Sequence, residues 1–485
     1  ITFTDKASAE MKERIFKELK ENNINHFGQE EEISTIHSFC SKFLKNHVTE
    51  ANLSPSFKMA DASLIEDIYA NILEKIKQGE YFTIPNIDKI VENLGLSTEI
   101  LEINNLAKLI AIQNIDTLFN DFISVIKKVK SLGLSPKEFL DKTIPAVQKF
   151  SETVETLPFK FPEKTDYLNS WETHLKSYCP KNCNFEKVFD NVCNEKVKTI
   201  ITKNGKSKTS EWGYAEGFPE NIKEITELEI YTIKVIACIY AIYQDILEGK
   251  DLVDFDDLIN KTIEILKNNE IIRRYYQKHF KHIIIDEFQD TNGAQVKLLE
   301  YLLPDEAPNI TMVGDKKQSI YGFRYARMEN LDILQDIIEK KYKKKYEEIK
   351  LKTNYRSSKQ ILDVVNYVTS EQLNLDEPIF AGTGEINDSE VKYSVINSEN
   401  IKTGLKEAEA KYMAQQILKY RNEKNLKYKD FAILVRKHSQ ADIIEQEFLK
   451  YGIPVIKKVN TNFFEKSVIK NIMSLFKLVQ NIRSE

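Results

Sequence analysis

The sequence has little glycine, few cysteines and no large excess of either charge. Glycine makes up 15 of 485 residues, about 3% against a typical 7%, which argues against collagen-like, elastic or propeller architectures and favours long helices. Five cysteines are too few for a disulfide scaffold, so a reducing, cytoplasmic compartment is expected. The 69 Lys and Arg residues nearly balance 74 Asp and Glu residues, and the net charge of −5 excludes a globally basic nucleic-acid binder. A local basic groove remains compatible with it.

Two kinds of segment are missing. The sequence has no uninterrupted run of 18 or more apolar residues, as a bilayer span would need, so no membrane partner is expected. It also has no Gly-x-x-x-x-Gly-Lys-[Ser/Thr] string, the glycine-rich loop that cradles nucleotide phosphates. Hydrophobic residues nevertheless make up 42%, enough for buried cores, and the length predicts about three domains.

Strand-to-helix passages occur toward both ends of the chain, and helical patterns dominate the middle. Residues 1–4 and 33–44 each begin with β-branched residues and continue at helical spacing, as βα units do. Residues 61–246 are mainly helical in pattern, apart from an irregular, tryptophan-containing stretch at 159–218. Residues 430–436 give the clearest strand of the C-terminal part.

The strongest chemical signal is the string Ile-Ile-Ile-Asp-Glu-Phe-Gln-Asp-Thr at residues 283–291. Three apolar β-branched residues predict a strand buried on both faces of a parallel sheet. Asp286 and Glu287 follow at its end, where ligands bind in open α/β sheets. Asp286 is suited to holding Mg²⁺ and Glu287 to orienting or deprotonating an attacking water. A solvated acidic turn is the alternative for Asp-Glu taken alone.

A second string, residues 312–324, begins with another short apolar run. Gly314 allows a tight turn, and Gln318 offers an amide to a terminal phosphate. Tyr321, Phe323 and Arg324 combine aromatic faces with a cation, the composition of a platform for unpaired bases. A Phe323 buried at a domain boundary is the alternative.

A third string, Leu-Lys-Thr-Asn-Tyr-Arg-Ser-Ser at residues 351–358, carries Tyr355 and Arg356. Tyr355 is suited to stacking on a purine, and Arg356 to stabilising transition-state charge as an arginine finger. Asn-Tyr-Arg alone is uninformative, and it gains meaning only from its position after the other two strings.

In this order the strings resemble the motifs of superfamily 1 DNA helicases of the UvrD/Rep type. Residues from about 80 to 230 have no counterpart. The matching segments are Thr2–Ile15 (motif Ia), Thr35–Cys40 (motif Ib), Asp254–Leu258, Asp286–Thr291 (motif II), Val313–Ala326 (motif III), Asn354–Ser357 (motif IV), Phe431–Arg436 and Gly452–Pro454.

The resemblance implies an ATP-dependent DNA helicase that uses ATP and Mg²⁺ and moves 3′ to 5′ on single-stranded DNA, with single-strand/duplex junctions as further partners. It implies Asp286 on Mg²⁺, Glu287 as catalytic base, and Gln318 and Arg356 on the γ-phosphate. Tyr355 would stack on adenine. The residues implied along the DNA track are Phe3, Thr4, Thr35, His37, Tyr321, Phe323 and Arg324.

The expected fold is α/β, with two RecA-like P-loop NTPase domains and a large, mainly helical insertion domain. ATP is expected between the two RecA-like domains. The expected divisions are 1–75 with 250–345 (first RecA-like domain), 76–249 (helical insertion), 346–460 (second RecA-like domain, incomplete) and 461–485 (start of a second accessory domain, with a helix at 463–482).

Several departures from the family pattern shape the expectation. Asp5 stands where the family usually has Asn, which adds negative charge near the DNA phosphates. The phosphate loop is expected before Ile1, and motifs V and VI after Glu485. The chain is therefore expected to be a helicase fragment with little hydrolytic activity of its own.

Two other functional classes stay open at this point. The long insertion also fits a subunit of an AddA/RecB-like helicase–nuclease, with a nuclease or recombination partner, in DNA repair or recombination. A non-catalytic relative that only binds single-stranded DNA is the third possibility.

Three weaker signals have ordinary explanations. Cys179, Cys183 and Cys193 could hold a metal, but their spacing fits no common site and free thiols are expected. The basic run at 340–346 is expected to be a solvated helix end. The pair Asp256-Asp257 is expected to serve packing or capping.

Overall fold

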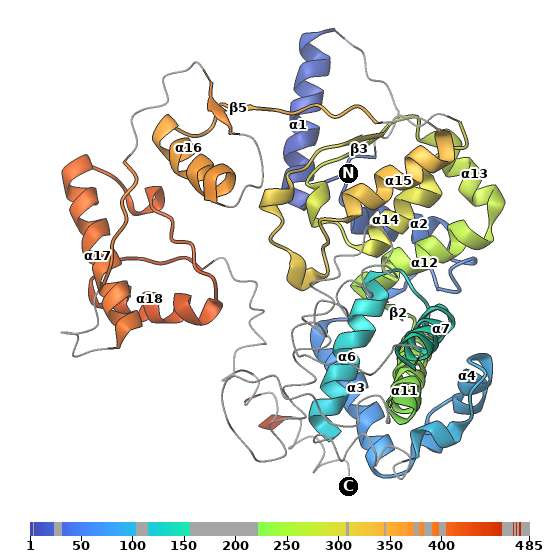
Figure 1. Ribbon diagram of the computed structural model, residues 1–485. Helices are drawn as coiled ribbons and strands as arrows, with labels where there is room; N and C mark the ends of the chain where they lie inside the picture. The colour runs from blue at the N-terminus through green and yellow to red at the C-terminus, as the bar shows by residue number, and fades with distance from the viewer. Residues whose placement is uncertain are drawn as a thin grey trace, which may run out of the picture. The chain divides into compact units, whose positions relative to one another are not determined.

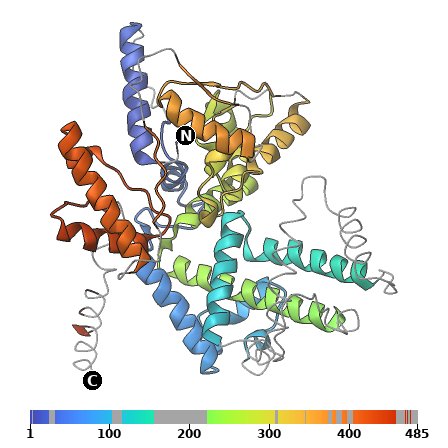
Figure 2. The same cartoon turned by 60° about the vertical axis from the view of Figure 1, so that its left-hand side comes forward.

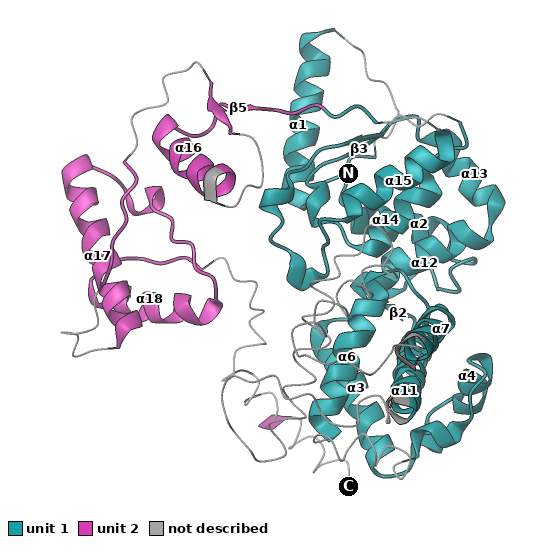
Figure 3. Cartoon of the chain, in the orientation of Figure 1, with its two compact units in different colours: residues 1–348 teal, residues 349–485 magenta. Residues whose placement is uncertain are grey.

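The computed structural model describes residues 1–2, 4–23, 32–102, 115–155, 222–306, 310–343, 346–372, 378–382, 390–396 and 404–457, with isolated positions between 469 and 476. The chain forms two compact units, Ile1–Glu348 and Ile349–Glu485, which are coloured separately in Figure 3. The predicted helix at 463–482 lies almost wholly outside the described residues. The cysteines at 179, 183 and 193 lie outside them altogether.

Short parallel strands lie at the centre of the α/β region of the first unit. Strand β3 (Ile283–Ile285) pairs in parallel with β4 (Ile310–Met312), with Ile285 opposite Met312. On the other side of β3, the terminal amine of Ile1 donates to the Ile284 carbonyl at 2.7 Å, and the Ile1 carbonyl accepts from the backbone N–H of Asp286 at 3.0 Å. Thr2 in turn forms a parallel bridge with Thr35. Four chain segments therefore lie side by side, and motifs Ia, Ib, II and III leave from them.

Helices pack around these strands and form one apolar cluster with them (Figure 1). Thr4 caps the first helix, because its hydroxyl accepts from the backbone N–H of Ala7. The side chain of Ile284 is 53% exposed, so the prediction of a strand buried on both faces is wrong at this residue. The helices of this cluster are α2 (Ile36–Asn46), α12 (Phe255–Asn268), α13 (Glu270–His279), the 3-10 helix η4 (Phe288–Asp290), α14 (Gly293–Leu302) and α15 (Asn330–Tyr342). Helix α1 (Asp5–Glu21) and the short 3-10 helices η5 (Lys316–Gln318) and η6 (Gly322–Arg324) belong to the same region but contribute no residue to the cluster.

A second apolar cluster in the same unit is built mainly from helices, as the turned view in Figure 2 shows. Its elements are α3 (Ala62–Lys77), η1 (Tyr81–Thr83), α4 (Ile87–Asn93), η2 (Thr98–Leu101), α6 (Ile115–Ser131), α7 (Pro136–Glu155) and α11 (Ile222–Gly249).

The chain enters and leaves this helical cluster through two adjacent strands. Strand β1 (Lys58–Met59) pairs in parallel with β2 (Leu252–Val253), and the backbone N–H of Ala60 donates to the Val253 carbonyl at 2.8 Å. Helix α3 buries Ile68, Tyr69 and Ile72 inside the helical cluster. Helix α3, which the expected division assigns mostly to the first RecA-like domain, therefore packs with the helices that follow it.

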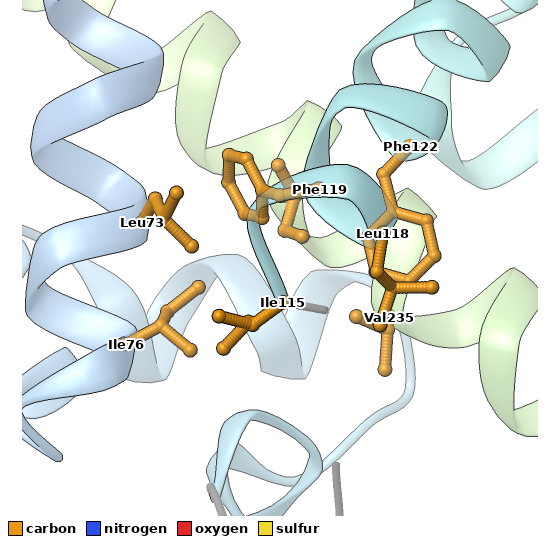
Figure 4. Close-up of a pocket in the computed structure, with 8 residues that line it drawn as sticks. Leu73, Ile76, Ile115, Leu118, Phe119, Phe122 and Val235 are labelled. Atoms are coloured by element: carbon orange, nitrogen blue, oxygen red, sulfur yellow. The ribbon is translucent and has the colours of Figure 1, made fainter. Parts of the chain in front are cut away.

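Helix α11 is the central helix of the insertion. Its segment Thr226–Gly249 is long enough and, at a mean hydropathy of 1.4, apolar enough to cross a membrane, although its longest uninterrupted apolar run is only Val235–Tyr243. Val235, Ala237 and Ile242 are fully buried against neighbouring helices, so the apolar character of α11 is accounted for by the core it fills. A small pocket beside it has only apolar side chains in its lining, from α3, α6 and α11 (Figure 4).

The second unit contains a smaller core. Its helices α17 (Leu405–Lys424) and α18 (His438–Lys450) bury Ala410, Ala414 and Phe448 against each other. The remaining elements are the parallel strands β5 (Thr353–Asn354) and β6 (Phe380–Ala381), α16 (Lys359–Asn366), the π-helical turn η7 (Tyr367–Gln372) and the 3-10 helix η9 (Tyr428–Asp430).

The strand predicted at residues 430–436 is absent. Residues 431–435 follow η9 without a ladder partner among the residues that the structure describes, and Leu434 is 97% exposed. An apolar, β-branched segment becomes a strand only where a neighbour supplies backbone hydrogen bonds.

Candidate functional site

The ends of strands β3 and β4 hold motifs II and III against each other. The backbone N–H of Val313 donates to the Ile285 carbonyl at 2.8 Å, and that of Phe288 donates back to the Val313 carbonyl at 2.9 Å. Because both strands run in the same direction, the residues that follow them emerge at one edge of the sheet. The two strings that the sequence analysis placed together are therefore neighbours.

Asp286 and Glu287 stand at this edge with accessible carboxylates. Asp286 is half-buried, and its Oδ1 accepts from the backbone N–H of Glu287 at 3.0 Å. Glu287 is exposed, and its backbone is left-handed, with φ of 51° and ψ of 43°. A non-glycine residue in this region is uncommon and costs roughly 1–3 kcal/mol. The left-handed residue turns the chain sharply at the strand end, where a ligand can reach both carboxylates.

Gln289, which the sequence analysis did not single out, joins the two motifs. Its side chain is buried, with 5% of the residue exposed. Its Nε2 donates to Glu287 Oε2 at 2.7 Å, and its Oε1 accepts from the backbone N–H of Asp315 at 3.0 Å. The available signal was its place inside the motif II string, but its partner in motif III is visible only in the fold.

Gln318 lies on the same loop and already has a partner. Its Nε2 donates to Asp315 Oδ2 at 2.9 Å. Burial raises the pKa of the Asp315 carboxyl, but hydrogen bonds from Gln318 and Lys317 outweigh burial, so that the pKa lies below its ordinary value. To contact a phosphate, the Gln318 amide would have to exchange Asp315 for the phosphate oxygen.

Tyr321, Phe323 and Arg324 form the aromatic and cationic group that the sequence predicts. The rings of Tyr321 and Phe323 are 5.7 Å apart, and the Arg324 guanidinium lies 5.3 Å from the Tyr321 ring centre. Phe323 is 75% exposed, so it is not a core residue of the first unit. An exposed Phe323 ring beside a half-buried Tyr321 ring and a cation suits stacking of bases.

Motifs Ia and Ib meet at Asp5. Its Oδ1 accepts long hydrogen bonds from the hydroxyls of Thr35 (3.4 Å) and Ser38 (3.5 Å). The Thr35 hydroxyl also caps α2 by accepting from the backbone N–H of Ser38. The acidic residue that departs from the family pattern is therefore held by hydroxyl groups between α1 and α2. Of the other predicted track residues here, Thr4 caps α1 and Phe3 lies outside the described residues.

His37 lies close to motif III. Burial, and next the positive charge of Arg324, lower the pKa of the His37 imidazole, against the opposite effect of Asp5. The His37 ring also packs edge-to-face against Phe255, with ring centres 5.2 Å apart.

Phe255 is a second residue that the sequence analysis missed. It is 64% exposed although it is a large apolar side chain. It occupies the first turn of α12, and Asp254 and Asp257 form the capping box that fixes this turn. The prediction of a capping role for the acidic pair is confirmed for Asp257, and the exposed phenylalanine between the caps extends the aromatic group that starts at His37.

Tyr355 and Arg356 belong to the second unit. Both side chains are exposed, and Asn354 Oδ1 orders the turn that carries them by accepting from the backbone N–H of Arg356 at 2.9 Å. The Tyr355 ring packs against Gly382, where an added Cβ would lie only 2.4 Å from Cδ1 of the ring. Gly382 thus lets the ring lie flat on the chain after β6.

The acidic residues at the strand ends fit a magnesium ion that is shared with phosphates. Within the described residues, no group of three or more His, Cys, Asp or Glu side chains could hold a metal by itself. Magnesium in nucleotide sites usually takes one or two carboxylates together with waters and phosphate oxygens. Asp286, half-buried at the end of β3 beside the exposed Glu287, is a carboxylate of this kind.

Comparison with known proteins gives matches along the chain. Residues 1–339 match the family described as UvrD/REP helicase N-terminal domain, and residues 349–485 match the UvrD-like helicase C-terminal domain. The chain is 35% identical over 249 residues to the ATP-dependent DNA helicase Rep of Buchnera aphidicola, covering 51% of this chain and 36% of that protein. It is 34% identical over 263 residues to the ATP-dependent DNA helicase PcrA of Staphylococcus aureus, covering 53% of this chain and 33% of that protein. The chain thus spans about a third of the length of these relatives.

Proposed function

The chain belongs to the UvrD/REP helicase family, and on this basis we propose that it is part of an ATP-dependent DNA helicase that moves 3′ to 5′ along single-stranded DNA. The observation that carries this proposal is the pairing of β3 with β4. This pairing joins the accessible acidic pair of motif II to a loop that bears exposed aromatic residues. Hydrolysis and strand binding are thereby served by adjacent residues of one sheet edge.

The nucleotide roles follow from chemistry at that edge. Asp286 would hold Mg²⁺, which supplies neutralisation of phosphate charge when it is bound with ATP. Glu287 would orient the attacking water and accept its proton, and its exposed position gives water access to the carboxylate. Gln318 would contact the terminal phosphate after leaving Asp315. We further propose that Tyr355 and Arg356, in the second unit, take part in nucleotide binding, with Tyr355 stacking on adenine and Arg356 contacting the γ-phosphate.

The DNA roles rest on exposed rings. Stacking of a base on an aromatic side chain contributes about 1–3 kcal/mol and is tolerant of sequence, as a translocating motor requires. Tyr321, Phe323 and Phe255 supply such faces, and Arg324 adds a cation for phosphates. Thr4, Thr35 and His37 would contribute further contacts with the DNA strand at the points where α1 and α2 begin.

Direction of movement is tested with the full-length protein on single-stranded DNA that carries streptavidin on a biotin at one end. A 3′-to-5′ motor displaces streptavidin from the 5′ end faster than from the 3′ end in the presence of ATP and Mg²⁺. Faster displacement from the 3′ end would contradict the proposed direction, and no displacement from either end would contradict translocation itself.

A second candidate function rests on the size of the insertion. The chain departs after β1 at Met59 and returns only at Leu252, and an insertion of this size also fits the helicase subunit of a helicase–nuclease. Degradation of linear duplex DNA by the full-length protein and its natural complex would support this reading. Unwinding without degradation would leave the helicase acting without a nuclease.

A further inference from the structure

We propose that Gln289 is a positioning residue that couples the loop binding single-stranded DNA to the catalytic carboxylate of Glu287. The inference deepens the proposed function and rests on it. Its basis is one buried amide group that bonds to motif II on one side and to motif III on the other.

The two hydrogen bonds of the Gln289 amide determine its orientation without ambiguity. A carboxylate oxygen can only accept, so the atom facing Glu287 Oε2 at 2.7 Å must be the Nε2 donor. A backbone N–H can only donate, so the atom facing Asp315 N at 3.0 Å must be the Oε1 acceptor. Because the amide is planar and both ends are engaged, a rotation that adjusts to one partner disturbs the bond to the other.

Packing at Gly314 leaves the amide little freedom. A Cβ added at Gly314 would lie 2.7 Å from Gln289 Oε1 and 3.3 Å from the backbone nitrogen of Phe288. The motif III backbone therefore lies directly on the Gln289 side chain. Movement of this backbone toward motif II would push on the amide, and movement away would break its bond to Asp315.

The loop that rests on Gln289 continues to the DNA-binding side chains. Asp315 caps the turn at Lys317 by accepting from its backbone N–H at 2.9 Å and also holds the Gln318 amide. Farther along, the Ser319 hydroxyl donates to the Gln289 carbonyl at 3.2 Å. Tyr321, Phe323 and Arg324 follow within a few residues. Bases stacked on these rings would thus pull on a loop that is bonded to Gln289 at two points.

The hydrogen bond from Gln289 can determine the rotamer of the Glu287 side chain. Glu287 is an exposed residue, and an exposed glutamate has several rotamers of similar energy. The Gln289 amide selects among them. A group that acts as a general base must lie within hydrogen-bond reach of its water, so the rotamer affects the rate.

Two substitutions at Gln289 test this role. Gln289→Glu keeps an acceptor for the Asp315 N–H but removes the donor to Glu287. Gln289→Leu removes both the donor and the acceptor with a side chain of similar size. We expect the ATP turnover rate with single-stranded DNA to fall by about tenfold or more in both variants. We expect the DNA-free rate to fall less, so that the stimulation ratio drops, and KM for ATP and Kd for DNA to stay within about threefold.

The matched control is Gln277→Leu. Gln277 is similarly buried, and its Nε2 donates to the carbonyls of Tyr301 (3.0 Å) and Leu303 (2.9 Å). This variant should lower thermal stability without lowering the stimulation ratio. If Gln289→Leu fails to fold, Gln289→Glu decides the test by itself.

The possible results distinguish the coupling role of Gln289 from the proposed helicase function. An unchanged stimulation ratio in the Gln289 variants, or parallel loss of stability, DNA affinity and both rates, would overturn the coupling role while leaving the helicase proposal intact. Absence of DNA stimulation in the wild-type protein would overturn the proposed function and the inference with it.

Discussion

Glu287 combines a strained backbone with an exposed carboxylate, and the surrounding residues explain why both persist. The hydrogen bond from the backbone N–H of Phe288 to the Val313 carbonyl anchors the chain just after Glu287. The Asp286 carboxylate accepts from the backbone N–H of Glu287. These bonds offset a left-handed conformation that costs roughly 1–3 kcal/mol. The result at the residue scale is a carboxylate held at the end of a strand, where it can meet a water and a phosphate.

Phe323→Ala tests the base-stacking role. Loss of an exposed ring removes about 1–3 kcal/mol of stacking, so translocation and DNA affinity should fall while KM for ATP changes little. Translocation rate, DNA affinity and ATP affinity are measured on the same preparation. Equal loss of DNA and ATP binding would instead indicate a role in packing.

Phe255→Ala tests the residue found only from the fold. Because its ring contacts His37 and is otherwise exposed, the variant should bind single-stranded DNA about five- to a hundredfold more weakly with little loss of thermal stability. Phe82→Ala is the control, since Phe82 is exposed on η1 in the helical cluster, outside the motif residues. Equal DNA affinity of both variants would exclude Phe255 from the track.

Asp256→Asn tests a pH dependence. Burial raises the pKa of the Asp256 carboxyl to about 6, and Asp254 and Asp257 add to the rise while Lys130 and Lys127 oppose it. The folded protein therefore holds this proton more tightly than the unfolded chain, and the group costs stability as pH rises from about 4 to above 6. The variant should be more stable than wild type at pH 8, by about 1–3 kcal/mol, and nearly equal to it at pH 4.

The measurement for Asp256 is the free energy of unfolding in urea at both pH values. Asp88→Asn is a matched control, because Asp88 also lies in the first turn of a helix but is exposed. The Asp88→Asn variant loses the same favourable interaction with the helix dipole. It does not gain the free energy that Asp256→Asn gains by removing a buried charge. A gain for Asp256→Asn that is the same at pH 4 and pH 8 would contradict the burial argument.

Among the helices, a buried ion cluster links α6 and α11 of the helical cluster to α12 of the α/β region. Lys130, at the end of α6, bonds to Asp254 at 2.5 Å and Asp257 at 2.6 Å, the two caps of α12. Tyr243 of α11 donates to Asp254 at 2.8 Å. Burial lowers the pKa of the Lys130 amine, but the two carboxylates outweigh burial and raise it overall. The cluster orders the α12 turn that presents Phe255.

Lys130→Met should lower the free energy of unfolding by about 3–5 kcal/mol, because it leaves two buried carboxylates without their cation. Thermal and urea unfolding measure this loss. Lys137→Met on α7 is the control, since its pair with Asp141 is exposed and should contribute less than about 1 kcal/mol. Similar losses in both variants would show that the buried cluster contributes no more than a surface pair.

Over the whole molecule, the features predictable from sequence were those carried by short contiguous strings. The acidic turn at Asp286 and the aromatic loop at Tyr321 each follow an apolar run, and parallel strands bring such ends together. The role of Gln289 was not predictable, because its partner Asp315 lies 26 residues away. The helical nature of α3 was readable from its spacing, but its membership of the insertion depends on tertiary packing.

In the C-terminal part, the sequence predicts a strand that the structure does not contain. Residues 430–436 have the composition of a strand, yet residues 431–435 have no ladder partner in the described part of the second unit. Composition reports which residues suit a sheet, whereas the sheet itself requires a neighbouring strand. For the same reason Ile284 is partly exposed although it lies in an apolar triplet: burial of a strand face depends on what covers it.

The most direct test of the account is the rate of ATP hydrolysis by the full-length protein carrying Glu287→Gln, measured with and without single-stranded DNA. The account predicts that the wild-type rate rises with DNA, and that the variant loses turnover by about 100-fold or more while it still binds ATP and DNA. If DNA-stimulated hydrolysis survives nearly intact in the variant, Glu287 is not the catalytic base, and the proposed motor site at the ends of β3 and β4 is contradicted.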